Sequence, residues 1–397
     1  MINPKDIIKK YTVEELCQAA DDYFKSISDP THLMAKPFSS LQETPGMLQN
    51  LGLLLSGLKL AKTMTVLEFA AGTCWFSRHL HQLQCKTISC DVSNTALEIG
   101  KHLFQKQPII GVPISEPTFL HFNGHKIDLP NESVDRIICH DGFHHIPNQE
   151  EVISELARVL KKGGIAGFCE PGKFHSQKPQ SQYEMNNFTV LENDILITEI
   201  YAFAQKYGFT DIRLKVLGGI DVSMNQYKFL VKLLSNKLLN KIFKLNIGNS
   251  ITDKTIFFLY KGENIPDSRS HVGLSHSITT SRDVFSVRAG ENLSILVNIS
   301  NTGDSRWLIE NIHDIGVVRI GTHLYDHANN LMDLDFSRYH ITTITEPGAT
   351  FEQSIKVKFE NPGLYRLAID LVSEHICWFE NVGSVPKFVT IKVESAQ

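Results

Sequence analysis

The spacing of hydrophobic and polar residues changes along the chain at a polar stretch between residues 262 and 276. Before it, short apolar runs such as MTVLEF (64–69), DRIICHD (135–141) and IAGFCE (165–170) alternate with segments of helical spacing. Continuous apolar strands separated by helices are typical of a parallel sheet with both faces covered. Ligands bind such a sheet beyond the carboxyl ends of its strands, so we expect the chemistry there.

The regions on either side of this alternation have patterns of their own. Residues 1–60 are predicted to be helical, with Thr12 and Glu15 forming a capping box ahead of apolar positions. Residues 225–246 place lysines among Leu, Ile and Phe. Such a helix can lie on an anionic membrane surface, but we favour a helical lid packed over the active site or against the β-rich region that follows. Beyond residue 276 the period becomes two, which predicts short antiparallel strands.

These patterns predict an α/β fold of Rossmann-like type with two additions. A chain of 397 residues is long enough for two or three domains. We expect an N-terminal helical extension or lid at residues 1–60 and the Rossmann-like domain at 61–262. An all-β immunoglobulin-like sandwich is expected at 276–397.

The first strand-to-helix turn, in VLEFAAGTCWFS (66–77), argues against a dinucleotide site. A pyrophosphate turn needs G-x-G-x-x-G, whereas the three positions here hold Ala70, Gly72 and Trp75. Asp91 ends the second strand, close to the offset of ~20 residues at which an acidic residue meets a ribose. With Glu68 beside the turn, two carboxylates flank a predicted nucleoside site that suits a ligand without phosphates.

Polar residues also follow the fourth and fifth strands, in HDGFHHIPN and CEPGKFHSQ. A histidine of near-neutral pKa is the natural base for removing a proton from a hydroxyl or amine. We rank His144 or His145 first as this base, then Glu170, then His175. The alternative is that the histidines only pack the turn and that Glu170 is a solvated acid at a strand end. No pair has the ligand spacing of an HExxH motif, so no metal site is expected.

The order VLEFAAGT, Asp91, DLPNESVDRI, FHHIPN, ELARVLKKGG resembles the class I S-adenosylmethionine-dependent methyltransferases, over roughly residues 60–261. The resemblance implies S-adenosyl-L-methionine as the cofactor. It implies that the first turn wraps the methionine part of the cofactor, that Asp91 binds the ribose, and that the segment after the fourth strand closes over the site. The cofactor-binding residues it implies are Glu68, Ala70, Gly72, Asp91, Asn123, Gly124 and Asp141, with Asn123 and Gly124 at the adenine.

The chain departs from the family pattern in the first turn and after the third strand. Ala70 and Cys74 stand where the family has glycines, and Asn123 stands where it has an aspartate. Alanine at position 70 is tolerable if its φ is negative, and an Asn amide still offers one acceptor and one donor to an adenine edge. These changes are expected to weaken cofactor binding more than they change the identity of the ligand.

The C-terminal region contains NTGDSRW and ENPGLYRLAIDLVSEHICWFENVGS. It resembles, more loosely, the sandwich domains of bacterial polysaccharide-handling proteins, including the carbohydrate-binding domain of O-antigen ABC exporters. The resemblance implies a sugar or glycan as the substrate or as a molecule docked beside it. Trp307, Trp378 and Tyr325 would be sugar platforms if exposed, although we favour core positions for the two tryptophans. A purely structural role, such as dimerisation or cover for a sheet edge, is the alternative.

Composition excludes some partners and favours a compartment. The formal net charge is −4, so the basic excess of a nucleic-acid-binding surface is missing. The sequence has no apolar run long enough for membrane insertion and no secretory signal pattern. Its seven scattered cysteines form no CxxC pair. These features favour the cytoplasm.

The sequence therefore predicts an enzyme that transfers a methyl group to an oxygen or nitrogen of a small molecule or saccharide. Polysaccharide or cell-surface glycan biosynthesis is the expected setting, and a homodimer is left open. Two alternatives remain: a glycan-binding protein with a cofactor fold that has lost its chemistry, and a protein or lipid methyltransferase whose β domain recognises a partner.

Overall fold

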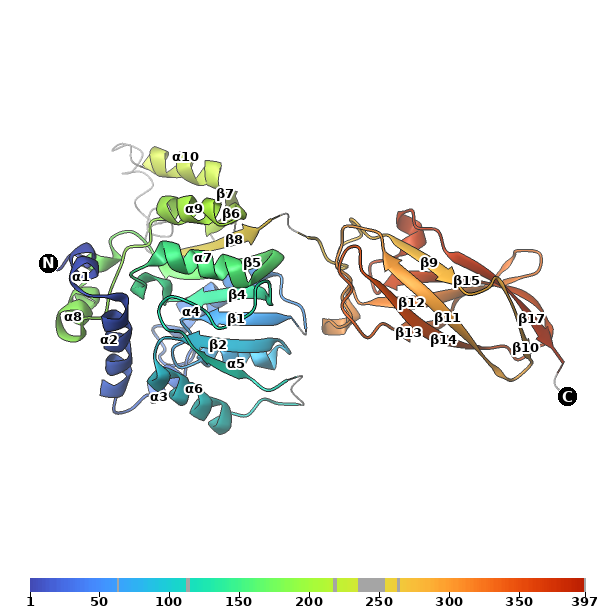
Figure 1. The fold of residues 1–397 in the computed structure, drawn as a ribbon, viewed down its shortest axis with the longest axis horizontal. Coiled ribbons are helices and arrows are strands. Elements are labelled where there is room, and N and C mark those ends of the chain that lie inside the picture. The colour runs from blue at the N-terminus through green and yellow to red at the C-terminus, as the bar shows by residue number, and fades with distance from the viewer. Residues whose placement is uncertain (63, 112–114, 217–219, 235–253, 263–264, 396–397) are drawn as a thin grey trace. The chain divides into compact units, whose positions relative to one another are not determined.

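The computed structural model describes residues 1–395 apart from 63, 112–114, 217–219, 235–253 and 263–264. The chain divides into two compact units, Met1–Asn264 and Ile265–Gln397 (Figure 1). Each unit has its own sheets and its own buried core. The predicted cofactor-binding and catalytic residues all lie in the first unit, and the candidate sugar platforms lie in the second.

The first unit is built on an eight-stranded sheet in the order β3-β2-β1-β4-β5-β8-β6-β7. Strands β1 to β5 pair in parallel, as the sequence predicts. The described strands are β1 (Thr65–Phe69), β2 (Lys86–Asp91), β3 (Thr118–His121), β4 (Val134–His140), β5 (Leu160–Pro171), β6 (Phe209–Val216), β7 (Ile220–Ser223) and β8 (Lys254–Lys261).

The expectation of a wholly parallel sheet is wrong at one edge. Strand β8 pairs antiparallel with both β5 and β6. Its first residue, Lys254, lies opposite Pro171, the last residue of β5, so β8 starts at the edge where β5 ends. This placement brings a lysine to the carboxyl edge of the sheet, where the site is expected. Strand β7, which sequence reasoning missed, forms a short antiparallel pair with β6.

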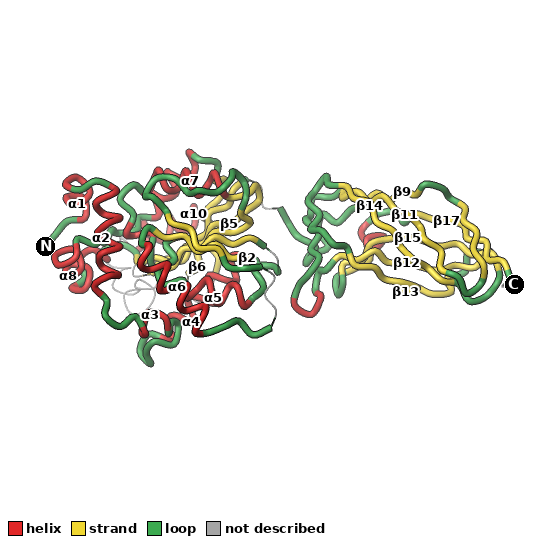
Figure 2. Tube along the Cα trace, turned by 60° about the horizontal axis from the view of Figure 1, so that its bottom comes forward, coloured by secondary structure: helices red, strands yellow, loops and turns green. Residues whose placement is uncertain are grey.

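Helices cover both faces of this sheet (Figure 2). Along β1, Leu67 and Phe69 belong to the cluster that includes Val152 and Leu156 of α7, while Glu68 points to the opposite face and meets α5. The helices are α1 (Pro4–Lys10), α2 (Val13–Ser26), α3 (Thr31–Met34), α4 (Thr44–Leu58), α5 (Trp75–Gln82), α6 (Asn94–Lys106), α7 (Gln149–Val159), α8 (Pro179–Phe188), α9 (Ile197–Lys206) and α10 (Met224–Leu234).

One helical feature predicted from the sequence is found in the first unit, and a second is described in part. Thr12 and Glu15 form the predicted capping box at the start of α2. The predicted basic helix is described only as α10, and its remainder, within 235–253, lies outside the described residues.

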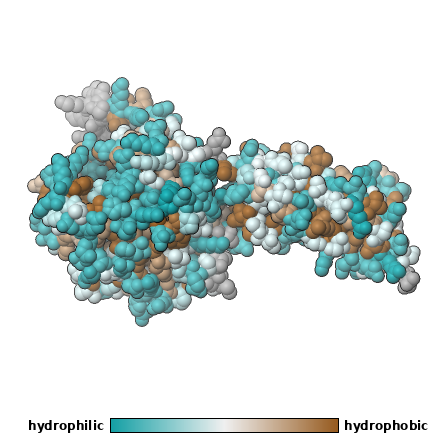
Figure 3. All heavy atoms as spheres, in the orientation of Figure 1, coloured by the Kyte–Doolittle hydropathy of each residue, from teal (hydrophilic) through white to brown (hydrophobic). Residues whose placement is uncertain are grey.

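No helix in the described part of the chain is long and apolar enough to cross a membrane. The face of the first unit in Figure 3 is mostly hydrophilic, with scattered apolar positions.

The second unit is rich in β-structure and has two sheets. One follows the order β10-β17-β15-β12-β13, with β16 paired to β15, and the other follows β14-β11-β9. The strands are β9 (His276–Thr280), β10 (Val284–Arg288), β11 (Asn292–Asn301), β12 (Val318–Asp326), β13 (Leu331–His340), β14 (Thr350–Lys358), β15 (Gly363–Ser373), β16 (Cys377–Trp378) and β17 (Lys387–Glu394).

The two sheets of the second unit share one buried core. Ile295 and Ile355 of the smaller sheet belong to the same cluster as Ile320 and Leu371 of the larger sheet. Trp307 is fully buried in that core, which is the position the sequence analysis favours for it, so it is not an exposed sugar platform. The immunoglobulin-like classification and the carbohydrate-binding role of this unit stay predictions.

Candidate functional site

A cavity of about 200 Å³ lies beyond the carboxyl ends of β1, β2 and β4. Its walls include Ala70 and Gly72 after β1, Asp91 at the end of β2, and Asp141 after β4. Helix α2 contributes an apolar side of the lining, with Leu16, Ala20, Tyr23 and Phe24 among its residues. The N-terminal region therefore forms part of the cavity wall, which is the position the sequence predicts for a lid.

A second cavity of about 180 Å³ shares part of this lining. The first cavity also reaches Asp91 and Gly124, whereas the second reaches Glu68, Trp75 and Lys36. The first-turn residues thus lie between two hollows, one beside the end of β2 and one beside the start of α5. The residues common to both are Tyr23, Phe24, Ala70, Gly72, Asp141 and His145.

Asp91 has a buried carboxylate that is held by the backbone on two sides. One oxygen accepts a hydrogen bond from the Gly72 N–H at 2.7 Å, and the other accepts one from the Ser93 N–H at 2.8 Å. Burial raises the pKa of Asp91, while these two N–H donors oppose that shift. Each carboxylate oxygen has a second lone pair. The group is therefore fixed in the cavity wall with acceptor capacity left for a ligand.

Glu68 lines the second cavity, but its carboxyl group is engaged by the start of α5. It accepts hydrogen bonds from both the backbone N–H and the hydroxyl of Ser77. Burial raises the pKa of Glu68 to about 8, against the effect of the Ser77 bonds. Glu68 therefore connects β1 to α5 and holds the first turn in place.

From the sequence, alanine at position 70 is acceptable only with a negative φ, and the structure does not meet this condition. Ala70 has φ +55° and Cys74 has φ +57°, so both lie in the left-handed region that glycine adopts most easily. Cys74 is accommodated because Gly100 of α6 leaves room for it: a Cβ at position 100 would lie 2.4 Å from the Cys74 sulfur. The turn thus keeps the backbone conformation of a glycine turn while carrying two side chains.

We expect Ala70→Gly to stabilise the first unit by about 0.5–1 kcal/mol. The substitution relieves left-handed strain but gives the unfolded chain more freedom, so the net gain is modest. Ala71→Gly is the matched control, because Ala71 is buried and is not among the residues of positive φ. It should destabilise by about 0.5–1 kcal/mol. Thermal unfolding of the two variants checks this, and a lower midpoint for Ala70→Gly would contradict it.

Of the two residues predicted to contact adenine after β3, Gly124 lines the first cavity and Asn123 does not. Gly124 lines the first cavity, with φ +92°, and a Cβ there would lie 2.7 Å from Val13 of α2. Asn123 is exposed and does not belong to the described lining. Its side-chain oxygen accepts hydrogen bonds from the N–H groups of His125 and Lys126, so it shapes the loop. The predicted adenine contact of Asn123 is therefore not supported by this geometry.

Asn148 is a polar residue of the cavity that sequence reasoning quoted in FHHIPN but did not single out. Its side-chain nitrogen donates to the Gly124 carbonyl at 3.0 Å and to Glu151 at 2.7 Å. These two bonds fix the amide orientation. Its buried oxygen has no hydrogen-bond partner among the described residues. Asn148 thus offers the cavity an unused acceptor beside Gly124.

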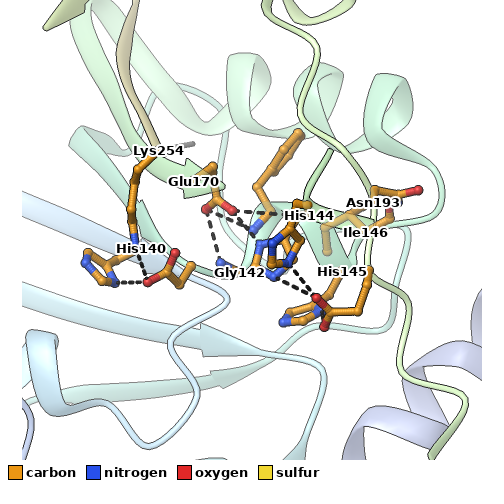
Figure 4. A network of polar contacts seen from close by, with 12 residues as sticks. His140, Gly142, His144, His145, Ile146, Glu170, Asn193 and Lys254 are labelled. Carbon is orange, nitrogen blue, oxygen red and sulfur yellow. Dashed lines mark hydrogen bonds and ion pairs between the residues drawn. The ribbon is translucent and has the colours of Figure 1, made fainter. Parts of the chain in front are cut away.

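Glu170 holds the turn that follows β4 (Figure 4). Its carboxylate accepts hydrogen bonds from the N–H groups of Gly142, Phe143 and His144 and from the His144 ring at 2.8 Å. The group is fully buried, and burial raises its pKa while His144 lowers it, with a lower value as the net result. Neither Glu170 nor His144 belongs to the described lining of the two cavities. Both groups therefore hold the turn in place, and the base role predicted for them stays a prediction.

His145 is the histidine of the pair that lines the cavities, and its side chain is 35% exposed. Its Nδ1 donates to the Leu191 carbonyl at 2.7 Å and lies 3.3 Å from a carboxylate oxygen of Glu192. Burial lowers the pKa of His145, but Glu192 and the Leu191 carbonyl raise it by more, so the net shift is upward. With the proton held at Nδ1, Nε2 is the nitrogen that can accept a proton.

Glu192 is a buried carboxylate that sequence reasoning missed. It accepts a hydrogen bond from the His175 ring at 2.6 Å. His175 therefore contacts Glu192, the carboxylate beside His145, and does not belong to the described lining of the first cavity. Burial raises the pKa of Glu192, but His175, His145 and His144 lower it to about 2. Glu192 lies in an irregular segment between α8 and α9, where no hydrophobic period marks it. Only the folded chain brings it to the histidines.

Asp141 lines both cavities and has φ +51°. Its carboxylate pairs with Lys254 at 2.6 Å and lies 3.5 Å from His140, as Figure 4 shows for the labelled Lys254 and His140. Burial raises the pKa of Asp141, but His140 and Lys254 together lower it well below its usual range. Lys254 was missed in the sequence because it is simply the first residue of an apolar strand.

Comparison with known proteins identifies the domain that the parallel strands form. Residues 67–168 match the family model described as a methyltransferase domain. Over 132 residues the chain is 26% identical to the ubiquinone/menaquinone biosynthesis C-methyltransferase UbiE of Shewanella pealeana, covering 32% of this chain and 51% of that one. It is 28% identical over 105 residues to the demethylmenaquinone methyltransferase of Streptomyces griseus, covering 26% and 41%. The chain thus spans about half the length of these relatives or less.

A solved structure is also similar in part. Phosphoethanolamine N-methyltransferase 2 of Haemonchus contortus, in complex with S-adenosylhomocysteine, superposes with a TM-score of 0.43 and 15% identity. The match covers 64% of this chain and 61% of that one. The family match gives the first unit a methyltransferase domain, and S-adenosylmethionine is the cofactor of that domain.

Proposed function

We propose that this chain transfers a methyl group from S-adenosylmethionine to a small, largely apolar acceptor whose proton is taken by His145. The observation that carries the proposal is the presence of His145 and Asp91 in the lining of one cavity. In this proposal Asp91 holds the cofactor, and His145 receives a proton from a neighbouring acceptor. The base, for which the sequence ranks His144 or His145 first, then Glu170 and then His175, is assigned here to His145.

The residues of the cavity suit the cofactor. Gly72 has φ +51° and no Cβ, and Phe24 Cζ, at 3.7 Å, is the only described atom close to where a Cβ would lie, so the backbone is open to a ligand. Asp91 offers carboxylate lone pairs of the kind that bind a ribose hydroxyl pair. Asn148 offers a buried acceptor that has no partner among the described residues, which suits an exocyclic amine. We assign the ribose to Asp91 and the adenine side to Gly124 and Asn148.

The chemistry assigned to this chain is proton removal and alignment. S-adenosylmethionine supplies an electrophilic methyl group when it is bound. His145 would accept the acceptor's proton at Nε2, which prepares the acceptor to take the methyl group as the bond between that group and the sulfonium sulfur breaks. The positive charge that develops on the ring is stabilised by the Glu192 carboxylate and by the Leu191 carbonyl at Nδ1. Glu170 holds the backbone of the turn that carries His145.

The lining favours an aromatic or otherwise apolar acceptor with an acidic hydroxyl. Tyr23, Phe24, Ile146 and Val190 supply apolar surface to the cavity that His145 lines, and Glu184 is an acidic residue of that lining. A saccharide would place many hydroxyl groups against this surface, where they would lack partners. Removing the proton of a ring hydroxyl serves methylation at that oxygen or at an adjacent ring carbon. The names of the two relatives, a C-methyltransferase of ubiquinone/menaquinone biosynthesis and a demethylmenaquinone methyltransferase, agree with an acceptor of this class.

Two measurements test the proposal. Calorimetric titration with S-adenosylmethionine should show binding, and titration with NAD should show none. Incubation with methyl-labelled S-adenosylmethionine and a panel of phenols, hydroquinones and sugars should then transfer label to a phenol or hydroquinone. Cofactor binding with label found only on sugars would overturn the acceptor class, and absence of cofactor binding would overturn the proposal as a whole.

A further inference from the structure

We propose that the second unit binds a divalent cation of the zinc type between His323, Asp370 and Glu380. His323 lies on β12, Asp370 on β15, and Glu380 in the 3₁₀ turn Phe379–Val382. One candidate ligand atom from each of the three residues lies within 4.8 Å of the other two. The site is separate from the methyltransferase domain and is carried by the unit whose role the proposed function does not use.

The fold brings these residues together across neighbouring strands. Gly321 of β12 lies opposite Asp370 of β15, and His323 follows two residues later, so His323 and Asp370 point to the same face of the sheet. A Cβ at Gly321 would lie 2.4 Å from Trp378. The absence of that atom lets the Trp378 ring pack against His323, with ring centroids 4.1 Å apart. The side chains of His323 and Asp370 are thereby fully buried.

The hydrogen bonds of His323 leave a buried lone pair aimed at a carboxylate. Its Nδ1 donates to the Leu334 carbonyl, so in the neutral ring Nε2 is an acceptor. Nε2 is buried and has no hydrogen-bond partner among the described residues. It lies 3.6 Å from a carboxylate oxygen of Glu380, which is also an acceptor. A buried imidazole acceptor that faces a carboxylate oxygen, rather than a donor, is costly unless a positive charge lies between the two.

The surroundings of the three residues are those of metal ligands. A ligating histidine commonly donates its other N–H to a carbonyl, as His323 does to Leu334. Asp370 is oriented by the His276 ring at 2.5 Å on one oxygen and by the Glu380 N–H at 3.1 Å on the other. Two carboxylates balance the charge of a dication, and the imidazole favours zinc over calcium or magnesium.

The arrangement needs only a small adjustment to bind an ion. Ligand atoms around one tetrahedral zinc ion lie roughly 3–3.5 Å apart. Glu380 is 32% exposed and lies in a short turn, so its side chain is the one able to close this gap. Binding would tie the turn that contains Glu380 to the two central strands. The three residues, at positions 323, 370 and 380, are too far apart in the sequence to form a local metal-binding motif. The sequence therefore predicts no metal site.

The test is zinc binding by the full-length, tag-free chain after chelator treatment, measured by competition with a chromophoric chelator. Glu380→Gln should weaken the tightest zinc site of the second unit at least tenfold and remove the zinc-dependent rise in its unfolding temperature. Glu352→Gln is the matched control, because Glu352 is an exposed glutamate of β14 in the same unit. It should bind zinc as the unchanged chain does.

A second variant separates this site from the other described cluster with metal-ligand geometry, His144, His145 and Glu192 of the first unit. Glu192→Gln should leave the zinc equivalent that depends on Glu380 in place. Zinc binding that is equal in Glu380→Gln and the unchanged chain would overturn the proposal. So would a folded, unchanged chain that binds no zinc, since a proton at His323 Nε2 would then fill the gap.

Discussion

Asp91→Ala should raise the dissociation constant for S-adenosylmethionine at least tenfold. The proposed ribose contact is two charge-assisted hydrogen bonds, each worth roughly 1.5–3 kcal/mol, and about 1.4 kcal/mol corresponds to a factor of ten. The substitution also frees the Gly72 and Ser93 N–H groups that Asp91 holds. Asp91→Asn is the milder variant, because the amide keeps one acceptor and the side-chain volume. Isothermal titration of both variants measures the effect.

A matched control separates loss of a ligand contact from loss of a structural carboxylate. Asp135 is also buried and also accepts a backbone N–H, from Thr65 at 2.9 Å, but it does not belong to the described lining of either cavity. Asp135→Asn should lower stability and leave the cofactor affinity of the folded protein unchanged. Cofactor binding that is as tight in Asp91→Asn and Asp91→Ala as in the unchanged chain would show that the ribose lies elsewhere.

The sequence predicts the cofactor side of the site from strand ends, which are readable in a linear pattern. Asp91 and Gly72 follow apolar runs whose carboxyl ends share one edge of the sheet, and the structure places both in the cavity wall. The pattern did not give the backbone conformation of Ala70, because residue type alone does not give the sign of φ. The side chain of Asn123 turns to its own loop, so its predicted adenine contact stays a prediction.

The catalytic side of the site depends on contacts that no local pattern records. Nothing in the FHH motif distinguishes His144 from His145; the distinction comes from Glu170 on another strand and from Leu191 and Glu192 on a later segment. The contact between Lys254 and Asp141 forms only because β8 runs antiparallel beside β5. Long-range pairing of this kind is set by tertiary packing, which also explains why the antiparallel direction of β8 was not predicted.

His145→Ala should lower kcat by about 10²–10⁴-fold on an identified acceptor, the usual contribution of general base catalysis. The dissociation constant for S-adenosylmethionine should change little, because the proposed cofactor contacts lie at Asp91, Gly124 and Asn148. His144→Gln is the matched control, since His144 precedes His145 in the chain but lies outside both described cavity linings. Equal losses of kcat in the two variants, at equal stability, would contradict the assignment of the base to His145.

The pH dependence of kcat gives a further test, because it reports whether Glu192 raises the pKa of His145. The ring must be neutral to accept a proton, so kcat should fall as the pH drops through the pKa of His145. Glu192 raises that pKa, so Glu192→Gln should move the acid limb of the profile to lower pH while it lowers the plateau, since the charged ring loses its stabilising carboxylate. A merely structural Glu192 would lower the plateau and leave the limb in place. An unmoved limb would therefore remove Glu192 from the proton-transfer step and leave His145 dependent on the Leu191 carbonyl alone.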